Sequence, residues 1–317
     1  MRAAVFDTYG PPDVVRVEEV PSPRPHASQV LVRVVATTVS VGDARIRGSR
    51  FPRGMTAPAR AMFGVRRPRR HVLGGPFSGV VEAVGTDVDD YAVGDEVCGI
   101  SPFRSMGAHA ELVAVQANRL ARKPDDVSHD DAAGVLFGGT TALTYLRDKA
   151  SVRRGQHVLV NGASGAVGSN VVQLAKYYGA TVTAITSATN LDLVTSLGAD
   201  TVVDYTQTPP TQIEGEYDVV VDTVGNVPAA TWKRLLTPGS GLLLLVVADL
   251  ATTIRATGNV KTGPASERRE DVEMLLRLLE AGRLQVVIDS TYDLDQVAEA
   301  HARVDTGHKV GNVMLRP

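Results

Sequence analysis

Short valine-rich runs, separated by polar turns, form the hydrophobic pattern of residues 1–123. The longest is residues 29–40, QVLVRVVATTVS, and shorter runs lie around Val80, around Val97 and over residues 112–115. β-Branched residues in runs bounded by Gly-Asp and Gly-Thr pairs are typical of strands and turns. Because no fixed repeat period is present, we expect a β domain here and neither a solenoid nor a propeller.

From residue 124 onward the pattern changes to alternating strands and helices. Residues 157–160, HVLV, form a short apolar run of the kind found in buried parallel strands. After it, apolar side chains fall at helical spacing from Val167 to Tyr178, and Gly179 follows at a position typical of a helix end. Further apolar runs lie at residues 181–185, 201–203, 219–221 and 242–247. This alternation predicts an α/β fold with a doubly wound parallel sheet.

The C-terminal part of the chain mixes both patterns. It predicts a helix over residues 267–281, a strand over 285–288, a second helix over 294–304 and a final strand over 311–315.

Length and composition limit the class of protein. The chain has 317 residues, with 33 Lys and Arg against 35 Asp and Glu, so its net charge is 33 − 35 = −2. This length suggests two domains. A near-neutral chain has no overall field to hold nucleic acid or an anionic membrane, so we expect neither as a partner. The longest apolar stretch, residues 242–248, is far shorter than the ~20 residues of a membrane-spanning helix.

The single cysteine, Cys98, bears on compartment and on metal binding. One thiol cannot form an internal disulfide, and it cannot supply a structural zinc site of the four-cysteine kind. The N-terminus reaches Asp7 before it could build the apolar region of a signal peptide. We therefore expect a cytoplasmic protein.

Nine arginines and no acidic residue lie between Ala44 and Val81, which gives this segment a local charge of +9. One interpretation is a solvated excursion balanced by the acidic residues 87–95 or by another subunit. A second is an anion-receptive rim near the active site, for a phosphorylated cofactor or an acidic substrate. Nucleic acid is the weakest interpretation, because residues 45–70, which hold all nine arginines, offer only Phe51 and Phe63 to stack on bases.

A glycine-rich turn, residues 161–168 (NGASGAVG), directly follows one predicted strand and opens one predicted helix. This is the context that a dinucleotide-binding fingerprint requires. Gly162 lets the chain reverse, Gly165 lets backbone N–H groups approach a pyrophosphate, and Gly168 lets helix and strand pack closely. The helix N-terminus adds free donors and partial positive charge.

The type of nicotinamide cofactor is indicated by an absent carboxylate. An NAD site offers Asp or Glu at the end of the second strand to bind the ribose 2′-hydroxyl. Here no acidic residue occurs from Gly162 through Leu191, and Ser187, Thr189 and Asn190 could donate hydrogen bonds to a 2′-phosphate. NADP is therefore favoured over NAD, although no Lys or Arg stands in this loop. Asn190 could also cap the next helix.

These motifs resemble the medium-chain dehydrogenase/reductase superfamily, in particular its zinc-independent quinone oxidoreductase and alkenal reductase branch. The resemblance covers essentially the whole chain. Similar segments are residues 1–5 (MRAAV), 39–48 (VSVGDARIRG), 77–85 (FSGVVEAVG), 94–99 (GDEVCG), 107–111 (GAHAE), 138–142 (GGTTA), 196–205 (SLGADTVVDY) and 307–312 (GHKVGN).

The resemblance implies a GroES-like β-barrel catalytic domain over residues 1–123, completed by 260–317, and a Rossmann NADP-binding domain over 124–259. The cofactor would lie in the cleft between them. The residues that it implies for cofactor binding are Thr141 beside the nicotinamide, Gly165, Ala166 and Val167 at the pyrophosphate, Ser187 and Tyr205 near the 2′-phosphate, Val224 and Gly225 along the cofactor, and Asn312 from the C-terminal strand.

The resemblance also bears on zinc. Zinc-dependent relatives place a cysteine ligand near residues 40–43 and a Gly-His-Glu before the Gly-Val-Val segment, whereas this chain has Ser40, Asp43 and residues 73–76 (LGGP) there. A catalytic zinc takes three protein ligands, which these residues do not supply. His71 and His109 are better explained as loop or barrel histidines, so no metal is expected.

Ser40, Asp43 and Arg45 are the candidate catalytic residues. Many zinc-independent relatives have Asn at the position of Ser40 and an acid at the position of Pro76, so both positions would border the substrate. Alkenal-reductase-like members carry a basic residue at the position of Arg45. A cation there could stabilise the enolate formed when hydride reaches the β-carbon of an unsaturated carbonyl. Arg45 as a solvated loop residue is the alternative.

The function expected from these residues is NADPH-dependent hydride transfer to a quinone or an α,β-unsaturated carbonyl. An enoyl-thioester reductase, whose basic rim receives a CoA or carrier phosphate, is one alternative. A non-catalytic NADPH-binding redox sensor is another. The apolar residues 242–247 resemble a sheet-edge strand through which relatives dimerise, so we expect a homodimer acting on a small electrophilic molecule.

Overall fold

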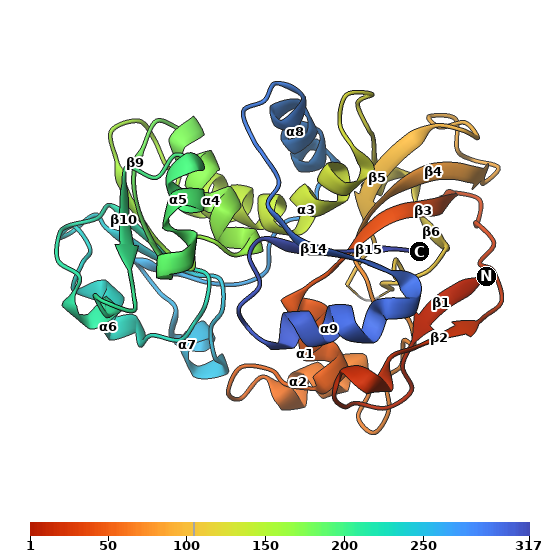
Figure 1. Ribbon diagram of the computed structural model, residues 1–317, viewed down its shortest axis with the longest axis horizontal. Coiled ribbons are helices and arrows are strands. Elements are labelled where there is room, and N and C mark those ends of the chain that lie inside the picture. Colours follow the sequence, from red (N-terminus) through yellow and green to blue (C-terminus); the bar gives the residue numbers. More distant parts are fainter. Residues whose placement is uncertain (104) are drawn as a thin grey trace.

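The structure is a computed structural model that describes residues 1–103 and 105–317 (Figure 1). The strands are β1 Arg2–Val5, β2 Arg16–Glu19, β3 Gln29–Val39, β4 Pro76–Val84, β5 Glu96–Ile100, β6 Leu112–Gln116, β7 Leu120–Arg122, β8 His157–Asn161, β9 Thr181–Thr186, β10 Thr201–Asp204, β11 Val219–Asp222, β12 Leu242–Leu245, β13 Val260–Lys261, β14 Ile288–Asp293 and β15 Asn312–Arg316. The helices are α1 Val41–Gly48, α2 Thr56–Phe63, α3 His129–Leu143, α4 Ala166–Tyr177, α5 Leu191–Ser196, α6 Ala229–Lys233, α7 Leu250–Arg255, α8 Arg269–Glu280 and α9 Val297–Asp305.

Six parallel strands form one sheet, in the order β10-β9-β8-β11-β12-β13. The chain enters at β8, builds β9 and β10 to one side, and then crosses to build β11, β12 and β13 to the other side. The point between β8 and β11 is therefore the topological switch point, where doubly wound sheets bind their ligands. The predicted α/β class and the doubly wound sheet are confirmed.

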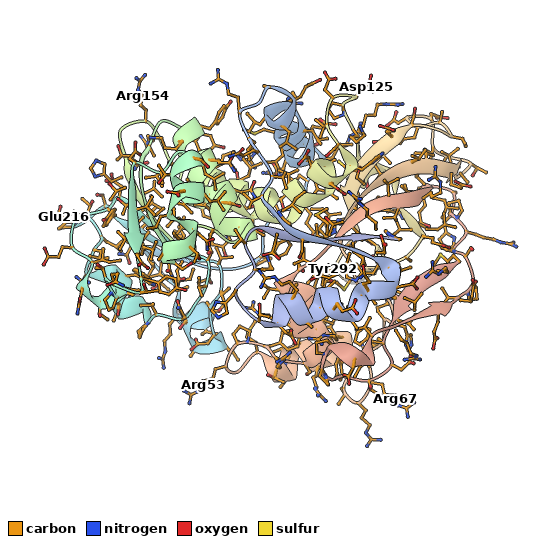
Figure 2. The ribbon with its side chains drawn as sticks, in the orientation of Figure 1. Arg53, Arg67, Asp125, Arg154, Glu216 and Tyr292 are labelled. Carbon is orange, nitrogen blue, oxygen red and sulfur yellow. The ribbon has the colours of Figure 1, made fainter. Side chains whose placement is uncertain are left out.

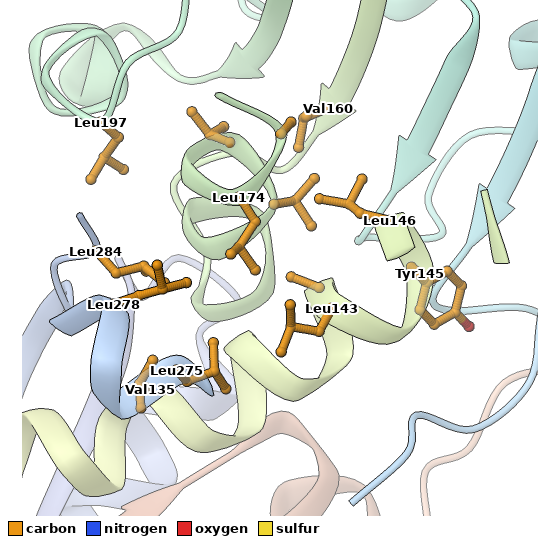
Figure 3. Packing of buried hydrophobic residues seen from close by; sticks show 14 of the residues in the cluster. Val135, Leu143, Tyr145, Leu146, Val160, Leu174, Leu197, Leu275, Leu278 and Leu284 are labelled. Carbon is orange, nitrogen blue, oxygen red and sulfur yellow. The ribbon is translucent and has the colours of Figure 1, made fainter. Parts of the chain in front are cut away.

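Helices cover this sheet because their apolar faces match its valine-rich strands. Figure 3 shows Leu143 of α3, Leu174 of α4 and Leu275 of α8 in one buried cluster with Val160 of β8. A second cluster, centred on the fully buried Trp232, includes Leu159, Val220 and Leu243 of three neighbouring strands. The two clusters fix the sheet between its layers, so the strand ends at the switch point are held rigidly.

The other large sheet has the order β14-β15-β3-β4-β5-β7, with β6 also paired to β3. It is antiparallel apart from the β14–β15 pair. Strand β15 comes from the far end of the chain and pairs directly with β3, so residues 312–316 complete a sheet begun by residue 29. In Figure 1 this sheet lies to the right and the parallel sheet to the left.

Three details differ from the expectations. The strand expected at residues 285–288 lies at β14, Ile288–Asp293, because the polar sequence IDSTYD is held by long-range pairing with β15. Strand β12 is not a sheet edge, since β13 pairs with it through Val260 and Lys261. These two residues therefore belong to the parallel sheet, although the expected boundary assigned residues from 260 onward to the other domain.

Candidate functional site

The glycine-rich turn connects β8 to α4 at the switch point. Gly162 has φ +79°, and a Cβ on it would lie 2.5 Å from Cγ2 of Val224. A Cβ on Gly168 would lie 2.0 Å from the carbonyl oxygen of Gly162. Both positions therefore need glycine, one for its backbone conformation and both for close packing. Gly165 caps α4 in an extended conformation and offers no side chain, so no side chain occupies the N–H groups of the first turn.

The first turn of α4 is also in direct contact with α3. A Cβ on Gly138 of α3 would lie only 2.0 Å from the carbonyl oxygen of Ala166. Val167, which follows in the same turn, is half-buried. Thr141 lies one turn further along α3, is buried, and donates its hydroxyl to the carbonyl oxygen of Phe137 at 2.7 Å. The turn and the start of α4 thus hold five of the expected cofactor residues, Gly162, Gly165, Ala166, Val167 and Gly168, and α3, which carries Thr141, packs directly against them.

Polar side chains gather where β9 ends. Asn190 donates to Oγ of Ser187 at 3.0 Å and to Oγ of Ser164 at 3.3 Å. Thr186 donates to the same Ser164 oxygen at 3.0 Å. The N–H of Tyr205, whose side chain is exposed, bonds the carbonyl of Thr186 at 3.0 Å. Asn190 occupies the N-cap position of α5, as the sequence suggested it could, but its side chain makes no capping bond; its amide ties the strand end to the glycine-rich turn instead.

Ser164 is a residue that the sequence analysis missed. Its hydroxyl accepts bonds from the end of β9, and its carbonyl accepts the N–H of Gly311 at 2.8 Å. Gly311 and Gly165 also form an isolated parallel bridge. The C-terminal segment therefore rests on the glycine-rich turn. Only the position of Ser164 inside that turn could have pointed to it from sequence.

Asn312 lies beside this contact, with its amide donating to the carbonyl of Val287 at 3.1 Å. The nearby Lys309 was also missed. Its half-buried ammonium donates to the carbonyl of Gly311, and burial lowers the pKa of Lys309 to about 8. The C-terminal segment thus adds an amide and an amine to the surroundings of the turn.

Val224 and Gly225 follow β11 on the other side of the switch point. Asp222, at the end of that strand, is fully buried and accepts the N–H groups of both residues at 3.0 Å. Gly225 has φ +75°. The sequence analysis placed Val224 and Gly225 here but overlooked Asp222, because a single Asp after an apolar run carries no distinctive signal.

Ser40 and Asp43 form a capping box at the start of α1. Asp43 accepts the N–H of Ser40 at 2.8 Å and its hydroxyl at 2.5 Å, and the hydroxyl of Ser40 accepts the N–H of Asp43 at 3.2 Å. The other carboxylate oxygen of Asp43 accepts the N–H of Gly74 at 3.0 Å. The bonds between Ser40 and Asp43 cap α1, and the bond to Gly74 ties the start of this helix to the segment before β4. A catalytic part for the two residues stays a prediction.

Arg45 lies on the same helix and is half-buried. Desolvation lowers its pKa, and within residues 1–103 and 105–317 no carboxylate pairs with its guanidinium. An unpaired, partly desolvated cation attracts an anion more strongly than a fully hydrated one. Of the three candidate catalytic residues, Arg45 therefore has the charge and the freedom to bind developing negative charge.

Part of the arginine-rich segment is balanced by an acidic residue that the sequence analysis did not name. Arg47 is fully buried and pairs with Asp305 of α9 at 2.6 Å, and Arg50 shares the same carboxylate. For these two arginines the balancing acid thus comes from the C-terminal helix, whereas Asp95, in the expected acidic stretch, pairs with Arg122. Figure 2 shows Arg53 and Arg67 pointing outward from the same side of the molecule.

The segment also touches the parallel-sheet half of the structure. The N–H of Leu250, which starts α7, bonds the carbonyl of Arg53 at 3.0 Å. A Cβ on Gly54 would lie 2.9 Å from Cβ of Leu250. The loop before α2 therefore connects the half of the molecule that contains the antiparallel sheet with the half that contains the parallel sheet.

The two histidines that the sequence analysis interpreted as loop or barrel residues, and not as metal ligands, lie in separate places. His71 contacts Asp7 at 2.7 Å near the surface, whereas His109 is buried and contacts the carbonyl of Thr38 at 3.0 Å. Among the residues that the structure describes, no group of three or more His, Cys, Asp or Glu could hold a metal ion. The same residues include no helix long and apolar enough to cross a membrane.

Comparison with known proteins gives the chain a context. Residues 26–125 match the family model of the alcohol dehydrogenase GroES-like domain, and residues 197–315 match that of the zinc-binding dehydrogenase. The GroES-like character expected of the first domain is thus confirmed. The chain is 31% identical to 2-methylene-furan-3-one reductase of Solanum lycopersicum, over 100% of this chain and 79% of the relative.

Two further matches agree with these. The chain is 31% identical to the chloroplastic NADPH-dependent alkenal/one oxidoreductase of Arabidopsis thaliana, over 100% of this chain and 80% of the relative. Among solved structures, the quinone oxidoreductase from Coxiella burnetii superposes with a TM-score of 0.90 at 28% identity, covering 100% of this chain and 99% of the other. Fold and sequence therefore point to the same group of proteins.

Proposed function

Because this chain belongs to the medium-chain dehydrogenase/reductase superfamily, in its quinone oxidoreductase-like branch, we propose that it is an NADPH-dependent oxidoreductase. Its substrate would be a quinone or an α,β-unsaturated carbonyl, the classes named for its relatives. The observation that carries the proposal is the start of α4 at the switch point, where glycines form the turn and no side chain caps the helix, beside a strand end without a carboxylate.

The residues present fit a dinucleotide with a 2′-phosphate. Gly162 and Gly168 let the turn pack closely against its surroundings, Gly165 places no side chain over the start of α4, and the free N–H groups there favour the charge of a pyrophosphate. Ser187 and Asn190 offer neutral donors at the ribose end, where a carboxylate would repel a phosphate. Thr141, Tyr205, Val224, Gly225 and Asn312 complete the proposed cofactor-binding set.

When bound, the reduced nicotinamide would supply the hydride, and the protein's part is to orient the reactants and exclude water. Arg45 is proposed to bind the oxygen of the substrate and to stabilise the negative charge that develops there when hydride reaches the β-carbon. Its half-burial strengthens that interaction relative to an exposed cation. The proton that completes the reaction would come from solvent.

The test is an NADPH-oxidation assay with a panel of quinones and 2-alkenals, run with NADH in parallel. We expect turnover with at least one of the two classes and a preference for NADPH. No turnover with either class would refute the proposal, and tight NADPH binding without oxidation by any acceptor would point to a non-catalytic binding protein.

Arg45→Ala tests the role of the guanidinium, with the exposed Arg53→Ala as the matched control from the same segment. A charge-assisted hydrogen bond contributes about 1.5–3 kcal/mol, so its loss should lower turnover about tenfold or more. Arg53→Ala should leave turnover unchanged. Equal rates in wild type and Arg45→Ala would remove Arg45 from the mechanism.

We further propose that the enzyme works without zinc, in the cytoplasm, as a homodimer. Support for the first point is that Cys98 is buried in the sheet, where burial raises the pKa of its thiol to about 12, so it is a poor metal ligand. One edge strand of the parallel sheet is β13, and a second copy could extend the sheet there. Activity retained after chelation, and a dimer mass in light scattering, are the expected results.

The domain boundaries also stay proposals. We propose a catalytic domain of residues 1–123 with the C-terminal segment, and a cofactor-binding domain that starts at residue 124. Because β13 belongs to the parallel sheet, the second boundary should follow Lys261 and not residue 259.

A further inference from the structure

Asp222 is a buried carboxylate at the carboxyl end of β11, on the edge of the sheet that faces the proposed cofactor site. It is fully buried and pairs in register with Asn161, the last residue of β8. These two strands flank the switch point. Asp222 and Asn161 therefore stand on opposite sides of the place where the two halves of the sheet meet.

Among the described residues, every group that donates a hydrogen bond to the Asp222 carboxylate is uncharged. One oxygen, Oδ1, accepts from Nδ2 of Asn161 at 2.9 Å and from the backbone N–H groups of Val224 and Gly225, each at 3.0 Å. The other oxygen, Oδ2, accepts from Nε1 of Trp232 at 3.0 Å. Burying a carboxylate is costly unless hydrogen bonds replace its hydration, so these bonds hold their donors firmly in place.

The loop after β11 is also fastened directly to the glycine-rich turn. Thr223 donates its hydroxyl to the carbonyl of Asn161 at 2.7 Å. A Cβ on Gly162 would lie 2.5 Å from Val224, and a Cβ on Gly225 would lie 2.9 Å from Val247. Residues 222–225 and the glycine-rich turn thus form one closely packed unit, with the Asp222 carboxylate at its centre.

The two sides of this unit meet different parts of a dinucleotide. In a doubly wound sheet each half binds one mononucleotide, and the half with the 2′-ribose site is the one that contains the second strand. Here that half contains β8, β9 and β10, with Ser187 and Asn190 at its edge. The half that begins with β11 is left for the nicotinamide mononucleotide.

We infer that Asp222 is a positioning residue, which fixes the backbone of Val224 and Gly225 against the glycine-rich turn and so sets the place of the nicotinamide half of the cofactor. The inference rests on the proposed function, since it needs a bound dinucleotide. Asp222 acts through the loop and does not itself contact the reacting atoms.

Asp222→Asn tests this with almost no change in volume. An amide has one acceptor oxygen and one NH₂ group, so either the three donors at Oδ1 or the Trp232 N–H must face another donor. We expect NADPH to bind at least tenfold more weakly, as measured by calorimetry or by fluorescence titration. Adenosine 2′,5′-bisphosphate, which carries only the adenine half, should bind within twofold of wild type.

Asp218→Asn is the matched control. Asp218 lies just before the other end of the same strand and accepts the N–H of His157 at 2.8 Å, so it too joins β11 to β8. It lies at the opposite edge of the sheet from the glycine-rich turn. Neither ligand should bind differently to this variant, and NADPH turnover should be unchanged.

The outcomes separate the inference from the proposed function. If wild type binds no NADPH, the proposed function is wrong and the inference falls with it. If wild type binds NADPH but Asp222→Asn binds it equally well, or loses both ligands to the same extent, the inference alone is wrong. Should Asp222→Asn fail to fold, Gly225→Ala disturbs the same loop from its other side. The same selective loss of NADPH affinity is expected from it, and its absence overturns the inference.

Discussion

A methyl group placed at Gly138 should weaken cofactor binding by moving one peptide unit. A Cβ on residue 138 would lie 2.0 Å from the carbonyl oxygen of Ala166, whereas real Cβ atoms essentially never come closer than 3.0 Å to such a non-bonded atom. Helix α3 and the start of α4 must therefore separate by at least 3.0 − 2.0 = 1.0 Å. The Ala166 carbonyl and the Val167 N–H belong to the same rigid peptide plane, so the N–H moves as well.

The size of the effect follows from hydrogen-bond geometry. A bond of ~2.9 Å lengthened by ~1 Å is no longer a hydrogen bond. A bond to a charged group contributes about 1.5–3 kcal/mol, so Gly138→Ala should weaken NADPH binding roughly 10- to 150-fold. Fluorescence titration measures this directly, and a thermal melt should show only a modest change, because Ala also gains up to about 1 kcal/mol of helix propensity.

Gly139→Ala supplies the control within the same helix. Its Cβ would meet Cδ1 and Cδ2 of Leu275 at 2.8 Å, the ends of a side chain on α8 and not the backbone of the turn. It gains the same helix propensity as the first variant, so NADPH affinity should stay within twofold of wild type. Gly138→Ala binding NADPH as wild type does, or both variants losing affinity equally, would refute the reasoning.

The remaining predictions concern stability. Asp305→Ala should lower the free energy of unfolding by about 3 kcal/mol in urea denaturation, because the buried Arg47 loses its carboxylate. Asp7→Ala, which removes an exposed ion pair, should cost about 0–1 kcal/mol, and equal losses in the two variants would contradict this account. Burial, together with the nearby His109 and Arg47, holds the pKa of His301 well below its ordinary 6.5. The neutral His301 therefore contributes fully to the free energy of unfolding above pH 6.5, and this contribution is lost as the pH falls toward the depressed pKa. His301→Gln should flatten the stability profile below pH 6.5, and an unchanged slope would show that other groups set it.

The strands and helices of the parallel-sheet half could be predicted from local sequence patterns. Residues 157–160 and the helical spacing from Val167 onward predicted β8 and α4 to within one or two residues, because each element is buried along its length and its periodicity is strong. Strand β14 was misplaced because it is half-exposed and polar, and its partner β15 lies about twenty residues away. No local signal distinguishes such a strand from a loop.

In the candidate site, too, some residues could be predicted from the local sequence and others could not. The glycines of the turn could be predicted because each answers a steric demand that few other residues meet. Ser164 and Asp222 could not, because their importance comes from partners contributed by other strands. The same holds for Asp305, whose role depends on Arg47 and Arg50, more than 250 residues earlier in the chain.

The pairing of β15 with β3 has a consequence for how the protein is made. On the ribosome, β3 emerges more than 270 residues before β15, and until then Thr37, Thr38 and Val39 at the end of β3 lack that partner strand, whereas residues 29–33 can already pair with β6. The glycine-rich turn likewise lacks the contact between Ser164 and Gly311 during that time. A nascent chain would therefore expose the unpaired end of β3 for most of its synthesis, the kind of strand edge that chaperones bind and that aggregates form on. Late truncation should be as damaging as a lesion in the glycine-rich turn, since one short segment completes both halves of the molecule.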